Sequence, residues 1–171
     1  MKKLLLLCLM LVLCLSLCSC EFLQDVLDST AHEEAENKVF EFDGLSIELT
    51  TAFLRMVIAG TNYDFIVGDG TVTVMGMKLE NDALSDLTAT EFAEFFCTLM
   101  EESTPTPVTH VNEIPTAQYV GTDDDGEQQT IAMMFYKATD CFWLVCFGAE
   151  SDSFDDVYGE ICHYATSVTC V

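Results

Sequence analysis

The chain has 171 residues, and its 29 Asp and Glu residues against 6 Lys and Arg give a formal net charge of −23 at pH 7. Half of the residues are hydrophobic, which is enough to build a core. Nucleic acids and anionic lipid head groups are recognised by clusters of Lys and Arg, so we expect neither as a partner.

The N-terminal residues read MKKLLLLCLMLVLCLSLCSC. A positive start and an apolar stretch over residues 4–17, shorter than the roughly 20 residues that cross a bilayer, are typical of a secretory signal peptide. Leu17-Cys18-Ser19-Cys20 resembles the lipobox of bacterial lipoproteins. In that family the Cys of the box receives a diacylglyceryl group and becomes the first mature residue. The resemblance implies a signal peptide over residues 1–19 and lipidation at Cys20; an uncleaved signal anchor is the alternative.

A lipidated Cys20 places the protein at the extracytoplasmic face of the cell membrane. Because the chain is acidic, palmitate-type acyl chains rather than electrostatic attraction hold it there. Residues 20–37 are acidic and lack a strand pattern, so we interpret them as a tether. Residues 38–171 have the length of a single domain.

Three Asp-Gly dipeptides, at Asp43, Asp69 and Asp125, predict tight turns, because both residue types tolerate positive φ angles. The predicted strands cover residues 39–42, 45–49, 71–79, 117–122, 129–137 and 141–148. The last strand, CFWLVCFG, is apolar on both faces, which predicts a central strand covered from both sides.

Two helices are expected to cover the strands. Thr88 and Glu91 match a capping box, and an apolar stripe at helical spacing follows them, made of Phe92, Phe95, Phe96 and Leu99. A second helix begins near Ser151 or Ser153. Its predicted buried face consists of Phe154, Val157, Ile161, Ala165 and Val168.

The order β-β-β-α-β-β-β-α predicts an α+β fold, an antiparallel sheet covered by two main helices. The phrases FEFDGLSIELT, LTATEFAEFF, CFWLVCFGAE and YATSVT within this order resemble the PsbP/DcrB-like superfamily of extracytoplasmic α/β/α sandwich domains. The resemblance implies a non-enzymatic accessory or binding domain, often a lipoprotein in bacteria, with no active-site residue to carry over. The high number of cysteines departs from that pattern.

Asp123, Asp124 and Asp125 form the most concentrated acidic cluster and are a candidate for weak cation binding. A calcium loop needs oxygens that converge, whereas these residues are consecutive and do not match an EF-hand loop. We therefore favour an exposed acidic hairpin turn over a cation site.

Five cysteines follow Cys20, so outside the cytoplasm at least one thiol is free or pairs between molecules. Cys141 and Cys146 differ by an odd number and point to opposite faces of one strand. Cys162 and Cys170 are the candidate disulfide. The cysteine and histidine spacings match no zinc motif, and we expect no metal or cofactor.

Motifs for a serine nucleophile or a phosphate-binding loop are missing from the sequence. These observations predict a membrane-anchored lipoprotein with a non-catalytic accessory or binding domain of the cell envelope, whose ligand is an unknown protein or small molecule. An envelope hydrolase that uses acidic residues without a recognisable motif is the alternative. A redox-linked protein that uses the unpaired thiol is a third hypothesis.

Overall fold

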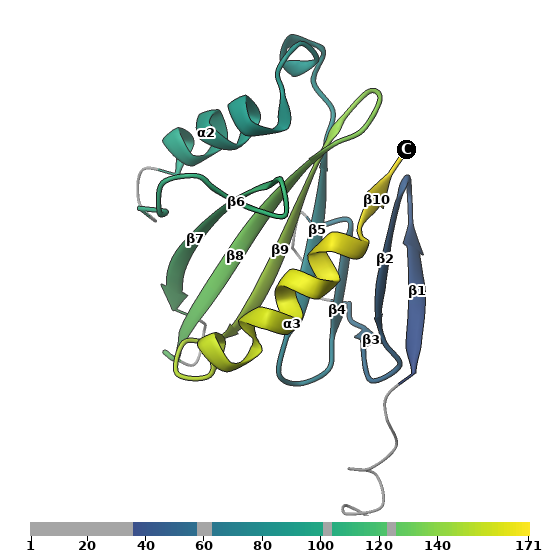
Figure 1. Ribbon diagram of the computed structural model, residues 1–171, viewed down its shortest axis with the longest axis vertical. Helices are drawn as coiled ribbons and strands as arrows, with labels where there is room; N and C mark the ends of the chain where they lie inside the picture. The colour runs from purple at the N-terminus through teal and green to yellow at the C-terminus, as the bar shows by residue number, and fades with distance from the viewer. Residues whose placement is uncertain (1–35, 58–62, 101–103, 123–125) are drawn as a thin grey trace, which may run out of the picture. The chain divides into compact units, whose positions relative to one another are not determined.

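The computed structural model describes residues 36–57, 63–100, 104–122 and 126–171 (Figure 1). The candidate signal peptide, Cys20, most of the tether and Asp123 to Asp125 lie outside these residues.

Seven antiparallel strands form the larger sheet. Its spatial order is β3-β4-β5-β9-β8-β7-β6. The strands are β3 (Leu54–Arg55), β4 (Phe65–Gly68), β5 (Thr73–Leu79), β6 (Thr109–Val111), β7 (Ile114–Thr122), β8 (Gln128–Lys137) and β9 (Phe142–Glu150). The strand β9 lies in the middle, between β5 and β8.

A second, three-stranded sheet is formed by β1 (Asn37–Phe42), β2 (Leu45–Thr50) and β10 (Thr169–Cys170), in the order β1-β2-β10. The first hairpin and the last residues of the chain are therefore neighbours. The sequence predicted one sheet and left out β3, β4, β6 and β10, so the small sheet is a difference from the expectation.

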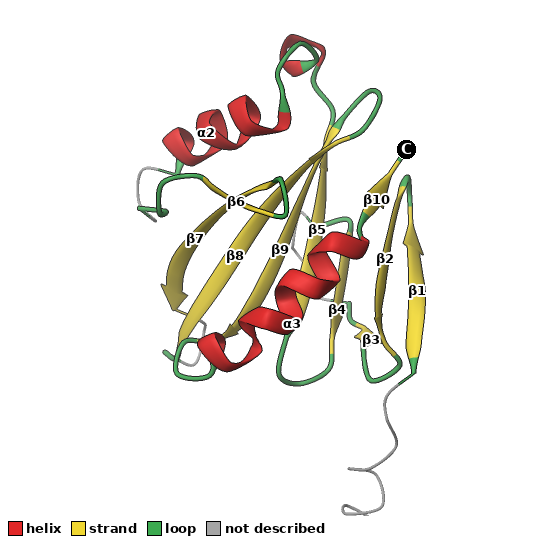
Figure 2. Ribbon diagram, in the orientation of Figure 1, coloured by secondary structure: helices red, strands yellow, loops and turns green. Residues whose placement is uncertain are grey.

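Two helices pack on opposite faces of the larger sheet, because they contribute to two separate cores. Figures 1 and 2 show where the two helices lie along the chain. Helix α3 (Phe154–Ser167) packs with the small sheet on one face, and α2 (Ala89–Leu99) lies on the other face, after a short 3₁₀ turn η1 (Asp82–Leu84). We call these the α3 side and the α2 side. The predicted α+β class with two covering helices is confirmed. No described helix is long and apolar enough to cross a membrane.

Strand β9 serves both cores, as its apolar run predicted. Trp143, Val145 and Phe147 point to the α3 side, whereas Leu144 and Cys146 point to the α2 side. All five are buried. The alternation follows from the pleat of a strand, whose successive side chains leave opposite faces.

The predicted Asp-Gly turns at Asp43 and Asp69 are confirmed by the glycines, which have φ angles of +85° at Gly44 and +96° at Gly70. Gly126 has a φ angle of +89°, whereas Asp125 lies outside the described residues. At the second turn, Oδ1 of Asp69 accepts hydrogen bonds of 2.8 Å from the amides of Thr71 and Val72. Such turns need a residue that enters the left-handed region without a steric penalty.

Helix α2 begins at the predicted capping box, but the side that faces the sheet differs from the predicted apolar stripe. The amide of Thr88 donates to Oε2 of Glu91 at 2.8 Å, and the Thr88 hydroxyl accepts from the Glu91 amide at 3.2 Å. Phe92 is buried, whereas Phe95 is 44% exposed and Leu99 is 63% exposed. The side that faces the sheet is made of Phe92, Ala93, Phe96, Cys97 and Met100.

The prediction was therefore wrong for Phe95 and Leu99. On a helix, residues 92, 96 and 100 lie between two rows of side chains, one with Phe95 and Leu99 and the other with Ala93 and Cys97. Either row can share their face, because i+3 and i+4 neighbours lie on the same side. Hydrophobicity favoured the row with Phe95 and Leu99, whereas the close approach of α2 to β7 and β8 selects the smaller Ala93 and Cys97.

Candidate functional site

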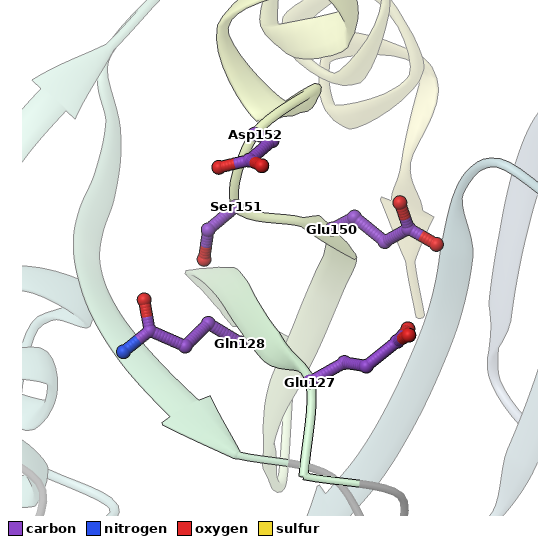
Figure 3. Close-up of a pocket in the computed structure, with 5 residues that line it drawn as sticks. All are labelled: Glu127, Gln128, Glu150, Ser151 and Asp152. Carbon is purple, nitrogen blue, oxygen red and sulfur yellow. The ribbon is translucent and has the colours of Figure 1, made fainter.

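A cavity of about 330 Å³ opens where β8 begins and β9 ends (Figure 3). It is lined by Glu127, Gln128, Glu150, Ser151 and Asp152. The backbone brings these segments together, because Gln129 pairs with Glu150 in the β8–β9 register and the Ser151 amide donates to the Gln128 carbonyl at 2.9 Å. The cavity is thus a product of the turn that leads from β9 into α3.

Acidic side chains dominate this cavity, but they do not converge. Figure 3 shows the side chains of Glu127 and Glu150 extending to one side and the carboxylate of Asp152 lying on the other. Among the residues that the structure describes, no group of three His, Cys, Asp or Glu side chains is arranged to hold a metal ion. The cavity residues alone therefore do not form a metal centre.

The predicted cation-binding residues precede the cavity in the chain. Asp123, Asp124 and Asp125 lie outside the described residues, so their role stays a prediction. Sequence reasoning selected this acidic loop but missed Glu150 and Asp152, which the strand register brings to the same end of the sheet.

The polar side chains near the cavity serve the structure. The Ser151 hydroxyl hydrogen-bonds the Thr130 hydroxyl at 2.9 Å. The ring of His110 hydrogen-bonds Thr90 at 3.1 Å, and His163 is exposed on α3. A nucleophilic hydroxyl needs a base within hydrogen-bonding reach, and the Ser151–Thr130 pair consists of two hydroxyls. The Thr90–His110 pair does not line the cavity.

The five cysteines between Cys97 and Cys170 are free thiols in the structure. The predicted disulfide between Cys162 and Cys170 is therefore not present in it. The prediction that Cys141 and Cys146 occupy opposite faces of the strand is confirmed, because they pack on the α3 side and the α2 side respectively.

Burial keeps the thiols of Cys97, Cys146 and Cys170 protonated at neutral pH. It raises the pKa of Cys146 and that of Cys170 to about 12, and for Cys170 the neighbouring Cys141 adds to the effect. Burial likewise raises the pKa of Cys97. A reactive cysteine is stabilised as the thiolate, which is the opposite arrangement.

Beyond α2, part of the α2 side is only half-buried. Met75, Tyr119 and Ile131 lie around the buried Cys146, and Tyr63 lies near Cys146 and Tyr119. Burial raises the pKa of Tyr119 to about 12, and the Cys146 and Tyr63 groups add to this shift. The sequence analysis did not select these residues. Met75 on β5 and Tyr119 on β7 belong to strands in which apolar residues recur at every second position, which is the signal that could have identified them.

Comparison with known proteins rests on structure alone, because no family model and no curated sequence matches the chain. Cyanobacterial PsbP from Synechocystis sp. PCC 6803 is similar with a TM-score of 0.51 and 11% identity, over 82% of this chain and 95% of that one. The Ran-binding protein Mog1p of Saccharomyces cerevisiae is similar with a TM-score of 0.51 and 12% identity, over 81% and 97%.

A protein of Bacteroides thetaiotaomicron VPI-5482 reaches a TM-score of 0.55 at 10% identity over 81% of this chain, which spans about half (49%) of that protein's length. Likeness at such low identity carries information about the fold and not about the ligand. Together with the helices on opposite faces of the larger antiparallel sheet, it shows that the described part of the chain has a PsbP-like α+β fold.

Proposed function

We propose that this chain is a lipid-anchored lipoprotein of the cell envelope whose PsbP-like domain is a non-catalytic binding or accessory module. The observation that carries the proposal is the PsbP-like fold. The same fold occurs in a Ran-binding protein, which is consistent with a scaffold used for binding. At the acidic cavity the Ser151 hydroxyl pairs with the Thr130 hydroxyl and the Ser151 amide donates to the Gln128 carbonyl, which fits a structural role for this serine.

The anchor belongs to the same proposal. Cys20 carries the diacylglyceryl group after removal of residues 1–19, and residues 20–37 tether the domain of residues 38–171 to the extracytoplasmic face of the membrane. The acidic surface then keeps neighbouring copies apart, because like charges repel at short range.

Expression of the full chain in a bacterium tests the anchor. We expect intact mass measurement to find an N-terminal diacylglyceryl-Cys20 in the membrane fraction, and C20S to abolish it. The matched control is C18S, which alters the neighbouring cysteine of the box and should still be lipidated. Wild-type protein with an intact leader, or found unmodified in the cytosol, would contradict the anchor.

Crosslinking in intact cells tests the binding function. The bait is the full lipoprotein, and the control is a deletion that keeps residues 1–37 and removes the domain. A crosslinked protein that depends on the domain supports the proposal, whereas identical crosslinks for the bait and the deletion count against it.

The three carboxylates around the cavity are the observation that favours the alternative, an envelope hydrolase. The triple variant E127Q, E150Q and D152N separates the two functions. A hydrolytic activity of the purified protein that this variant loses would replace the binding proposal with the alternative.

A further inference from the structure

Two of the free thiols, Cys141 and Cys170, point into the same end of one core. Cys141 is 8% exposed and belongs to the cluster on the α3 side. Cys170 is half-buried against the same cluster and pairs directly with Leu45 in the β2–β10 ladder. Directly opposite residues in an antiparallel pair share a face, so Cys170 lies on the face of the small sheet from which Leu45 enters the core.

Several contacts bring the two chain segments to this end. Trp143 follows Cys141 by two residues and pairs with Lys78, and the Lys78 ammonium contacts the Asp43 carboxylate at 3.5 Å. The neighbouring Gly44 carbonyl accepts the Val171 amide at 3.0 Å. These contacts connect the segment around Cys141 with the segment around Cys170 through the β1–β2 turn. The Cys141 thiol also contributes to the raised pKa of the Cys170 thiol.

We propose that Cys141 and Cys170 are a redox-sensitive pair, and that a disulfide between them fastens the C-terminal strand β10 to the β8–β9 turn. The bond encloses helix α3 within a loop of about 30 residues. It stabilises the fold chiefly by restricting the unfolded chain.

The oxidant is a small-molecule disulfide such as oxidised glutathione. At alkaline pH, the small ionised fraction of the more exposed Cys170 attacks one sulfur of that disulfide as the thiolate and releases one small thiolate, which leaves a mixed disulfide. The Cys141 thiolate then attacks the sulfur of Cys170 and releases the second small thiolate. The protein loses two electrons and two protons, and the oxidant gains them as two thiols.

The test uses the full chain, purified under reducing conditions and then incubated with oxidised glutathione at mildly alkaline pH, where more of the thiolate form is present. Cleavage after Lys and Glu separates the relevant cysteines. The peptide of residues 138–150 contains Cys141 and Cys146, and the peptide of residues 161–171 contains Cys162 and Cys170. A Cys141–Cys170 bond joins the two peptides, whereas a Cys162–Cys170 bond stays within one.

We expect mass spectrometry to find the two peptides joined, with the loss of two hydrogen atoms, in the wild type and in the C146S, C162S double variant. The bond should disappear in C170S and in C141S. Oxidation of the double variant should raise its Tm by about 10 °C, reversibly with dithiothreitol, and leave the Tm of C170S unchanged. The proposal is overturned by a bond confined to residues 161–171 or by a bond through Cys146. It is also overturned if the thiols of Cys141 and Cys170 still react with an alkylating agent. The test requires neither export nor a lipid anchor, so its result is independent of the proposed function.

Discussion

The two faces of the larger sheet differ in how completely they are covered. On the α3 side, a helix and a second sheet bury Trp143 and Phe147 to 0% exposure. On the α2 side, one helix lies over β7 and β8, and Met75 and Tyr119 stay half-buried beside it. The same central strand therefore supports a closed core on one face and a partly open one on the other. We expect the stability of the domain to depend mainly on the closed face.

The largest effect is expected from F147A, which removes a fully buried ring from the α3 side. Loss of such a ring costs about 3–5 kcal/mol of unfolding free energy, because a cavity replaces its contacts. The matched variant is F95A on the outer side of α2, where we expect a change within about 0.5 kcal/mol. Urea denaturation measures both. Equal losses of unfolding free energy for the two variants would contradict the expectation that the buried ring stabilises the domain more than the exposed one.

A pair of glycines tests the packing of the closed face. A Cβ atom on Gly76 would lie 1.9 Å from Cε1 of Phe65, whose ring stacks on Phe42 with 3.7 Å between centroids. We expect G76A to lower the unfolding free energy by about 1–3 kcal/mol through overpacking. Gly159 lies within α3, and a Cβ atom there would meet no neighbouring element within 4 Å, so G159A should raise the free energy by about 0.5–1 kcal/mol. Thermal and urea melts that give both changes the same sign would contradict this explanation.

On the α2 side, the capping box sets the start of the helix. T88A removes the hydroxyl that accepts the Glu91 amide and should cost about 1 kcal/mol in urea denaturation. T98A, which alters an exposed threonine further along the helix, is the control and should cost less. An equal or larger loss for T98A would show that the capping hydrogen bond contributes little.

The smallest effect concerns pH. Hydrogen bonds from the Thr88 amide and hydroxyl lower the pKa of Glu91 below its ordinary value of 4.5. The stability that the charged carboxylate contributes is therefore present above pH 4.5 and is lost as the pH falls through the lowered folded-state pKa. Melting temperatures between about pH 7 and pH 3 should fall less steeply for E91Q than for the wild type. E94Q, on the exposed surface of the same helix, should retain the wild-type slope; a flattened slope for E94Q would point to general charge effects.

Local signals in the sequence predicted much of this architecture. The Asp-Gly dipeptides at Asp43 and Asp69 make turns, Thr88 and Glu91 begin α2, and the apolar run after Cys141 becomes the central strand. In each case neighbouring residues contain the whole signal, because turn conformation, capping and strand pleat are determined within a few positions.

Features that depend on distant partners were not predictable in the same way. The small sheet requires β10 to meet β2, and the acidic cavity requires Glu150 to return beside Gln129. The rotation of α2 depends on the depth available over β7 and β8. Strand β4 was missed because its short run of buried residues shows neither the strand nor the helix period.

The pairing of β10 with β2 has a consequence for how the protein matures. Ser46 and Thr169 share a hydrogen bond of 2.7 Å across 123 positions of sequence. During synthesis the N-terminal hairpin therefore emerges long before the strand that completes its sheet, and it waits with one edge unprotected. Contacts between such remote positions slow folding, because a large loop must close before they form. Strand β10 thus completes the small sheet, and a nascent chain that stops just short of it leaves an open edge of β2 to which other chains can add.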